Sequence, residues 1–261
     1  MTGADLARMA LQHVSSLQAG GVSFLPSSDN IVPTVVSRLE KPVVVHSPGN
    51  ASSPATSMQK ATHSTTEAYS TDHKRHQLNL IDQQEVQPCT RCTELVRNRT
   101  RTVFGVGNVD TELLFIGEAP GADEDKAGEP FVGAAGQLLN KIIAACKLKR
   151  EEIYIANVLK CRPPGNRQPL ADEVSHCRGF LDRQIQLIQP KFICCLGLVA
   201  AQTILNTTIS IGKMRKQIHQ VDGIKVVATY HPAYLLRNPN AKKDVWDDMK
   251  MLMEAMGRPV A

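Results

Sequence analysis

Short apolar runs alternate with amphipathic segments from about residue 86 to the end of the chain. Each run is bounded by polar residues, Gly or Pro, as buried parallel strands are. The segments between the runs have the periodicity of crossover helices. The pattern predicts strands at 112–117, 153–157, 191–197 and 225–230, and helices at 136–148, 171–188, 198–205 and 242–256. We therefore expect an α/β fold with a four-stranded parallel sheet.

The first 85 residues have a different texture. Apolar residues recur at helical spacing between Asp5 and Gln18, and Gly20-Gly21 stops the pattern. Residues 24–84 are rich in Ser, Thr, Pro, His and Asn, a composition that buries too little surface to offset the entropy of ordering. We expect a short amphipathic helix in residues 1–23, a low-complexity linker in 24–85 that makes the N-terminal extension disordered, and one folded domain in 86–261.

Composition excludes several classes of protein. No stretch approaches the roughly 18 apolar residues of a transmembrane helix, and the N-terminus lacks a basic region followed by an apolar run. Seven cysteines without a secretory signal fit reduced thiols, so we expect an intracellular, cytoplasmic protein. The net charge of +5 suits a partner that carries phosphates, while an aromatic content of 4% disfavours a broad stacking platform for single strands.

Four cysteines stand in two pairs, Cys89-x2-Cys92 and Cys161-x15-Cys177. Four thiolates suit a soft metal ion or an iron–sulfur cluster. Zinc ribbons usually place a second tight pair after the first, so the wide second spacing favours a cluster over zinc. The alternative is a set of scattered buried thiols. That alternative is the expectation for the three cysteines inside predicted elements, which are Cys146, Cys194 and Cys195.

Unusual sequence follows three of the four predicted strands. These segments are Gly-Glu-Ala-Pro-Gly at 117–121, Asn157 with the cysteine segment behind it, and His-Pro-Ala-Tyr-Leu-Leu at 231–236. Ligands of parallel sheets bind beyond the carboxyl ends of the strands. The three segments are therefore expected to converge on one site.

Together with all four cysteines, five motifs between about residues 88 and 256 resemble the family-four uracil-DNA glycosylases, the iron–sulfur branch of their superfamily. The motifs lie at 117–121, 124–128, 130–139, 157–166 and 231–236. The resemblance implies a three-layer α/β/α sandwich and an enzyme of base excision repair. Such an enzyme hydrolyses the N-glycosidic bond of uracil in double- or single-stranded DNA and leaves an abasic site. It also implies a [4Fe-4S] cluster on Cys89, Cys92, Cys161 and Cys177, and we expect a monomer.

The residues agree with a pocket that reads a flipped-out base. Asn157 can donate to uracil O4 and accept from N3–H, whereas cytosine would leave buried polar groups unpaired at roughly 1–3 kcal/mol each. Phe131 is the expected stacking partner, although a Phe that plugs the sheet edge is the alternative. The loop with Gly117, Glu118, Ala119 and Gly121 is expected to complete the pocket and to bring backbone N–H groups close to a base carbonyl.

His231 is expected to hydrogen-bond uracil O2 as negative charge develops on the leaving base, unless its role is only structural. Glu124 is our first candidate to orient water and to stabilise the sugar cation, and Asp123 is the second. The alternative is a solvated acidic loop. Ala119 and Gly121 replace an Asp and a Tyr of the best-known branch, so the resemblance defines water activation and thymine exclusion less closely.

Basic and apolar residues near these motifs are expected to contact DNA. Leu235 and Leu236 would wedge the duplex while Arg237 contacts phosphate. The cluster would aim further cations at phosphate, namely Arg162, Arg167 and Lys160, with Arg97, Arg99 and Arg101 extending that surface. The apolar stripe of the N-terminal helix would bind a repair or replication partner.

Two other classes of protein remain open on the sequence. One is a non-catalytic iron–sulfur module that binds nucleic acid or senses redox state, and the other is a zinc-stapled nucleotide hydrolase. The non-catalytic module would need the cysteines and the basic residues, but not Asn157, Phe131 and His231 together.

Overall fold

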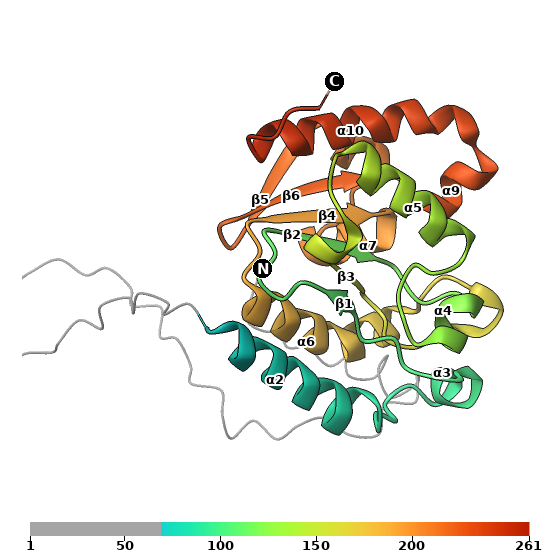
Figure 1. The fold of residues 1–261 in the computed structure, drawn as a ribbon. Coiled ribbons are helices and arrows are strands. Elements are labelled where there is room, and N and C mark those ends of the chain that lie inside the picture. The colour runs from blue at the N-terminus through green and yellow to red at the C-terminus, as the bar shows by residue number, and fades with distance from the viewer. Residues whose placement is uncertain (1–68, 261) are drawn as a thin grey trace, which may run out of the picture. The chain divides into compact units, whose positions relative to one another are not determined.

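A six-stranded mixed sheet forms the centre of the computed structural model, which describes residues 69–260 (Figure 1). The strand order is β1-β3-β2-β4-β6-β5. The four central strands are parallel, and the two edge strands pair antiparallel to their neighbours. The strands are β1 (Val106–Gly107), β2 (Leu113–Gly117), β3 (Tyr154–Asn157), β4 (Phe192–Leu196), β5 (Ile218–Val221) and β6 (Ile224–Thr229).

The four predicted parallel strands are confirmed, but the prediction of a sheet with only four strands is wrong at both edges. β1 is two residues long, too short to leave a period in the sequence. β5 is partly exposed along its length and joins β6 through the two-residue turn Asp222-Gly223. Both turn residues have positive φ, 48° and 83°, which matches the right-handed twist of a hairpin and explains the Asp-Gly sequence.

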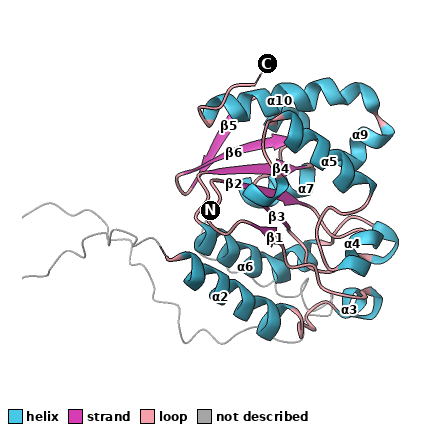
Figure 2. Ribbon diagram, in the orientation of Figure 1, coloured by secondary structure: helices cyan, strands magenta, loops and turns pink. Residues whose placement is uncertain are grey.

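The helices cover both faces of the sheet (Figure 2). Alternate residues of β2 show the division: Leu114 and Ile116 pack into a core with α6 (Ala171–Ile188) and α7 (Leu198–Leu205). Leu113 and Phe115 pack into a second core with α5 (Ala134–Ala145) and α10 (Lys242–Ala255). This alternation is the period of two expected of a strand that is buried on both faces. The three layers and the four predicted helices are thereby confirmed. The three remaining cysteines are buried, as expected: Cys146, Cys194 and Cys195.

Short helices fill the connections. Those after the central strands are α4 (Ala122–Ala127), η3 (Pro164–Asn166) and α9 (Pro232–Arg237), which follow β2, β3 and β6. The others are η1 (Asp82–Val86), α3 (Thr93–Asn98), η2 (Arg150–Glu152), α8 (Ile211–Met214) and η4 (Pro239–Ala241). Within residues 69–260, the structure contains no helix with the length and apolar character needed to span a membrane.

Helix α2 (Thr71–Ile81) lies in the segment expected to be linker, so that expectation is wrong for residues 71–85. The helix packs along α6 (Figure 1), where Leu78, Ile81 and Val86 join the core. Its first turn is capped by the Ser70 hydroxyl, which accepts from the N–H of His73. The sequence pattern did not predict this helix because its few apolar residues stand among polar ones. The helix predicted between residues 5 and 18 lies outside the described residues.

We predict that α2 is an integral part of the folded domain. Leu78→Ala should lower the free energy of unfolding by about 2–5 kcal/mol, because it removes buried methyl groups and leaves a cavity against α6. Leu170→Ala is the matched control, since Leu170 is 54% exposed and should change stability by no more than about 0.5 kcal/mol. Urea denaturation of both variants measures the difference, and equal midpoints would contradict the packing of α2.

Candidate active site and cysteine centre

A pocket of about 360 Å³ opens where β2, β3 and β6 end. Parallel register brings these three carboxyl ends to one edge of the sheet, as the sequence indicated. Most of the predicted base-pocket residues line it: Glu118, Ala119, Gly121, Phe131, Asn157 and His231. Glu124, Arg167 and Arg237 line it too, together with Tyr234 and Asn166, which the sequence analysis did not single out.

The Asn157 side chain faces this pocket from the end of β3 and is 2% exposed. Its Oδ1 atom is buried without a hydrogen-bond partner. Buried polar atoms of folded proteins are nearly always paired, so an unpaired acceptor in a pocket indicates a ligand that donates to it.

Gly117 makes room for this arrangement. A Cβ atom at Gly117 would lie 2.4 Å from Asn157 Oδ1 and 2.6 Å from the Cζ atom of Phe131, closer than real carbon contacts. The two side chains therefore occupy the space that any other residue at position 117 would fill. This is the reason for a glycine at the end of β2, in addition to the freedom that it gives the loop.

Phe131 stands at the same wall in a left-handed backbone conformation, with φ 56°. Such a conformation in a bulky residue costs about 1–3 kcal/mol and is concentrated at functional sites. Its ring is 5% exposed and lies 5.5 Å from the ring of His231, tilted by 31°. Phe131 both packs into the core below the sheet edge and lines the pocket, so the two readings of this residue are not exclusive.

His231 is held in one tautomer. Its Nδ1 accepts from the N–H of Ala233 at 3.1 Å and caps helix α9, which places the proton of the neutral ring on Nε2. Burial lowers the pKa of His231 to about 4, and the charge of Arg237 acts in the same direction. The imidazole is therefore neutral at pH 7 and offers one N–H donor.

Glu124 ties three backbone segments together. Oε1 accepts from the N–H groups of Val132 and Gly133, both at 2.9 Å, and Oε2 accepts from Gly121 at 3.1 Å. Since each carboxylate oxygen accepts about two hydrogen bonds, one position on Oε2 is left. Asp123 is exposed and is not part of the pocket lining. Glu118 is partly buried, and burial raises the pKa of its carboxyl group.

The four paired cysteines come from three segments of the chain and share the core that includes α6: Cys161 and Cys177 are buried in it, and Cys89 and Cys92 pack against it. Burial, together with the charges of the nearby Cys177, Cys161 and Cys89, raises the pKa of Cys92 to about 11. All four thiols are free. Within residues 69–260, no group of three or more His, Cys, Asp and Glu side chains has the arrangement to hold a metal ion.

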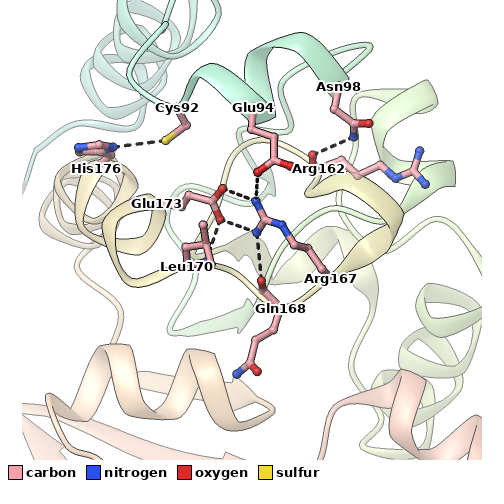
Figure 3. Close-up of polar contacts among 9 residues, drawn as sticks. All are labelled: Cys92, Glu94, Asn98, Arg162, Arg167, Gln168, Leu170, Glu173 and His176. Atoms are coloured by element: carbon pink, nitrogen blue, oxygen red, sulfur yellow. Dashed lines mark hydrogen bonds and ion pairs between the residues drawn. The ribbon is translucent and has the colours of Figure 1, made fainter.

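Hydrogen-bond donors surround these sulfurs. Arg99 Nη1 donates to Cys161 Sγ at 3.0 Å, while its Nη2 donates to the backbone carbonyls of Gln87 and Cys89, both at 3.0 Å. His176 Nδ1 lies 3.4 Å from Cys92 Sγ (Figure 3). The donation from Arg99 favours the thiolate of Cys161, the form that binds metal. Arg99 was expected on the DNA surface, and its position at the sulfurs corrects that expectation.

Arg167 is held by carboxylates (Figure 3). Its guanidinium donates two hydrogen bonds to Glu173, at 2.7 and 2.9 Å, and a single one to Glu94 at 2.7 Å. These contacts raise the pKa of Arg167. These ion pairs join the loop after Cys161 to α3 and α6. They also neutralise much of the Arg167 charge that was expected to contact DNA phosphate. Arg162 is partly buried and donates to Asn166 Oδ1 at 2.8 Å.

Two residues predicted to contact DNA are buried, so those predictions are wrong. Leu235 is 1% exposed and belongs to the core, while its neighbours Leu236, at 47%, and Arg237 are exposed. Lys160 is 1% exposed, and its Nζ donates to acceptors inside the domain. Burial lowers the pKa of Lys160 to about 7.

Comparison with known proteins agrees with this site. Residues 104–250 match the family described as the uracil DNA glycosylase superfamily. The chain is 45% identical over 184 residues to the type-4 uracil-DNA glycosylase of Archaeoglobus fulgidus, covering 67% of this chain and 91% of that protein. It is 45% identical over 168 residues to the type-4 enzyme of Thermotoga maritima, covering 64% and 87%. A type-5 uracil-DNA glycosylase of Pyrobaculum aerophilum is 28% identical over 180 residues, covering 56% of this chain and 79% of that protein. The chain therefore belongs to the uracil DNA glycosylase superfamily, in its type-4 branch.

Proposed function

We propose that the uracil-DNA glycosylase activity of this chain resides in the pocket at the ends of β2, β3 and β6. The reaction is hydrolysis of the N-glycosidic bond, which releases uracil and leaves an abasic site for base excision repair. The observation that carries the assignment is the unpaired, buried Oδ1 atom of Asn157. Membership in the type-4 branch opposes the alternatives of a non-catalytic module and a nucleotide hydrolase.

Asn157 reads the Watson–Crick edge of the flipped base. Its Oδ1 accepts from uracil N3–H, which satisfies the orphaned acceptor, and its amide nitrogen donates to O4. Cytosine has a bare N3 and an amino group at these two positions, so it would face Oδ1 without a donor and set two donors against each other. Phe131 stacks on the face of the base, supported from behind by the core of α5 and α10.

His231 stabilises the leaving group. The neutral ring directs Nε2–H toward the pocket, because Nδ1 is fixed on Ala233, and donates to uracil O2 as the base acquires negative charge. A neutral donor gives this stabilisation without placing an ion in the pocket before the reaction.

Glu124 orients the pocket walls and a water molecule. Three of its acceptor positions hold the loops at 121 and 132–133, and the remaining position on Oε2 is the one available to the attacking water. Its negative charge also stabilises positive charge that develops on the sugar. Asp123, exposed beside Gly133, remains the second candidate.

Helix α9 supplies the contact with DNA. Leu236 is exposed on this helix and fills the space that the flipped base leaves, while Arg237, which lines the pocket, contacts phosphate. Arg162 extends the same surface, because only one of its nitrogens is engaged by Asn166.

A [4Fe-4S] cluster on Cys89, Cys92, Cys161 and Cys177 completes the site. The four free thiols, the influence of three of them on the pKa of Cys92 and the donation from Arg99 to Cys161 fit a thiolate-bound cluster. Glycosidic hydrolysis needs no change of oxidation state, so a cluster held by these four residues would serve as a covalent staple between the α3 segment, the loop after β3 and α6.

The first prediction concerns base recognition. Asn157→Asp replaces the donor that faces O4 by an acceptor, so release of uracil from labelled DNA should fall at least about tenfold, or roughly 1.4 kcal/mol. The same carboxylate accepts from the cytosine amino group, so slight release of cytosine is also expected, a gain that loss of stability cannot mimic. A variant that is folded and removes uracil at the wild-type rate would refute the placement of the pocket.

A second prediction concerns pH. With a pKa of about 4, His231 stays neutral where an ordinary histidine, with a pKa of about 6.5, gains its proton. Turnover of uracil-containing DNA should therefore show no histidine-like step between about pH 5 and pH 7. His231→Ala should lower turnover for every base that the enzyme removes. NMR titration of the ring, assigned with that variant, measures the pKa directly, and a midpoint near 6.5 would contradict the proposed neutral donor.

A third prediction concerns the cluster. Protein purified without oxygen should be brown and contain iron and sulfide. Cys161→Ala should lose iron and lower the melting temperature, because the staple between three segments is broken. Cys195→Ala is the matched control: this thiol is 0% exposed inside β4 and should keep the iron. Colourless protein with stoichiometric zinc would contradict the assignment.

A further inference from the structure

We infer that Lys160 is a positioning residue for uracil recognition: its buried ammonium group holds the backbone carbonyl of Asn157 and thereby fixes the Asn157 side chain in the pocket. The inference rests on the proposed role of Asn157. It assigns a task to a lysine that the sequence placed on the DNA surface and that the structure places inside the domain.

The Lys160 ammonium group uses all of its hydrogen-bond donors inside the domain. It donates to the Asn157 carbonyl at 2.9 Å, to the Phe104 carbonyl at 3.0 Å and to Gln184 Oε1 at 2.6 Å. An ammonium group has three N–H donors, so none is left for DNA phosphate. All three acceptors are neutral amide oxygens. A buried lysine with only such partners costs more free energy than an apolar side chain of the same length, so packing alone does not account for it.

The carbonyl of Asn157 lies where the sheet ends. β3 pairs with β1 only through Tyr154 and Ile155, so the β1 side of Asn157 has no ladder partner. On the other side, the N–H of Val158 donates to the Gly117 carbonyl at 3.0 Å. Because the peptide unit between Asn157 and Val158 is planar, its C=O points away from β2, toward Lys160. Lys160 and Gly117 thus hold the two sides of the peptide that carries the reading side chain.

Lys160 is itself anchored at the cysteine centre. It precedes Cys161, and its carbonyl accepts from the N–H of Val103 at 2.8 Å. Its third acceptor, Gln184, lies on α6, the helix that also carries Cys177. One short turn therefore joins the sulfurs to the floor of the base pocket, and the Lys160 side chain closes that turn.

The test is a double-mutant cycle in the full-length protein. Lys160→Met keeps the length of the side chain and removes its donors, and it should lower kcat/KM for uracil-containing DNA about tenfold. In an Asn157→Ala background, the same change should have less than about a twofold further effect, because residues that act through one contact are not additive. Iron content and melting temperature are measured for each protein.

Lys74→Met is the matched control. Lys74 is also buried, at 7% exposure, and its Nζ also donates to a backbone carbonyl, that of Ile188, yet it does not line the pocket. Its loss should lower the melting temperature and leave kcat/KM unchanged. If Lys160→Met does not fold, Gln184→Ala replaces it, since it frees the ammonium from its shortest bond and should lower kcat/KM in the same direction.

Three results would overturn the inference: unchanged kcat/KM in folded Lys160→Met, unchanged kcat/KM in the substitute Gln184→Ala, or an equal loss with and without the Asn157 side chain. An equal loss would mean that Lys160 acts on stability or on another group. These results are distinct from failure of the proposed function, which would appear as a wild-type protein that releases no uracil.

Discussion

The space beside Gly117 is the constraint on which the base pocket depends. In the parallel ladder Gly117 pairs with Asn157, so their Cα atoms are neighbours and a side chain at 117 would enter the volume that Asn157 and Phe131 use. The strand register therefore also shapes the pocket. It places Asn157, the proposed base-reading residue, beside a glycine, the one residue type that leaves room for its side chain. The same close approach recurs at Gly136, where a Cβ atom would lie 1.9 Å from the Phe131 carbonyl. Two glycines thus allow the backbone and the ring of Phe131 their positions.

Electrostatics in the pocket follow from the burial of its polar groups. Burial lowers the pKa of His231, raises that of Glu118 and leaves an acceptor on Asn157 unpaired. Each of these states costs stability in the empty protein, and in the proposed function each is relieved or used when a base with the matching edge enters. The domain offsets that cost elsewhere, in two apolar cores that cover both faces of the sheet.

Sequence periodicity predicted the elements that are long and regularly patterned, and the strand ends predicted where the pocket lies. Periodicity did not predict the orientation or the contacts of single residues. Leu235 and Leu236 are adjacent on a helix of six residues, too short for a period to show which one faces the core. The partners of Lys160 and Arg99 lie on distant segments, so the sequence alone presents these basic residues as DNA contacts until the fold is known. Helix α2 was missed because its buried face is formed by only a few residues of a polar segment.

The lone pair of His231 Nδ1 connects the proposed stabilisation of the leaving group with the proposed DNA contact of α9. His231 Nδ1 is the N-cap acceptor of α9, the helix that carries Leu236 and Arg237. Adding a proton to that atom changes the ring from a neutral donor to a cation and, in the same event, removes the cap from the helix. If the proposed roles hold, acid would therefore disable the leaving-group contact and loosen the wedge together, so an enzyme that no longer cleaves the glycosidic bond would also no longer hold a base out of the DNA duplex.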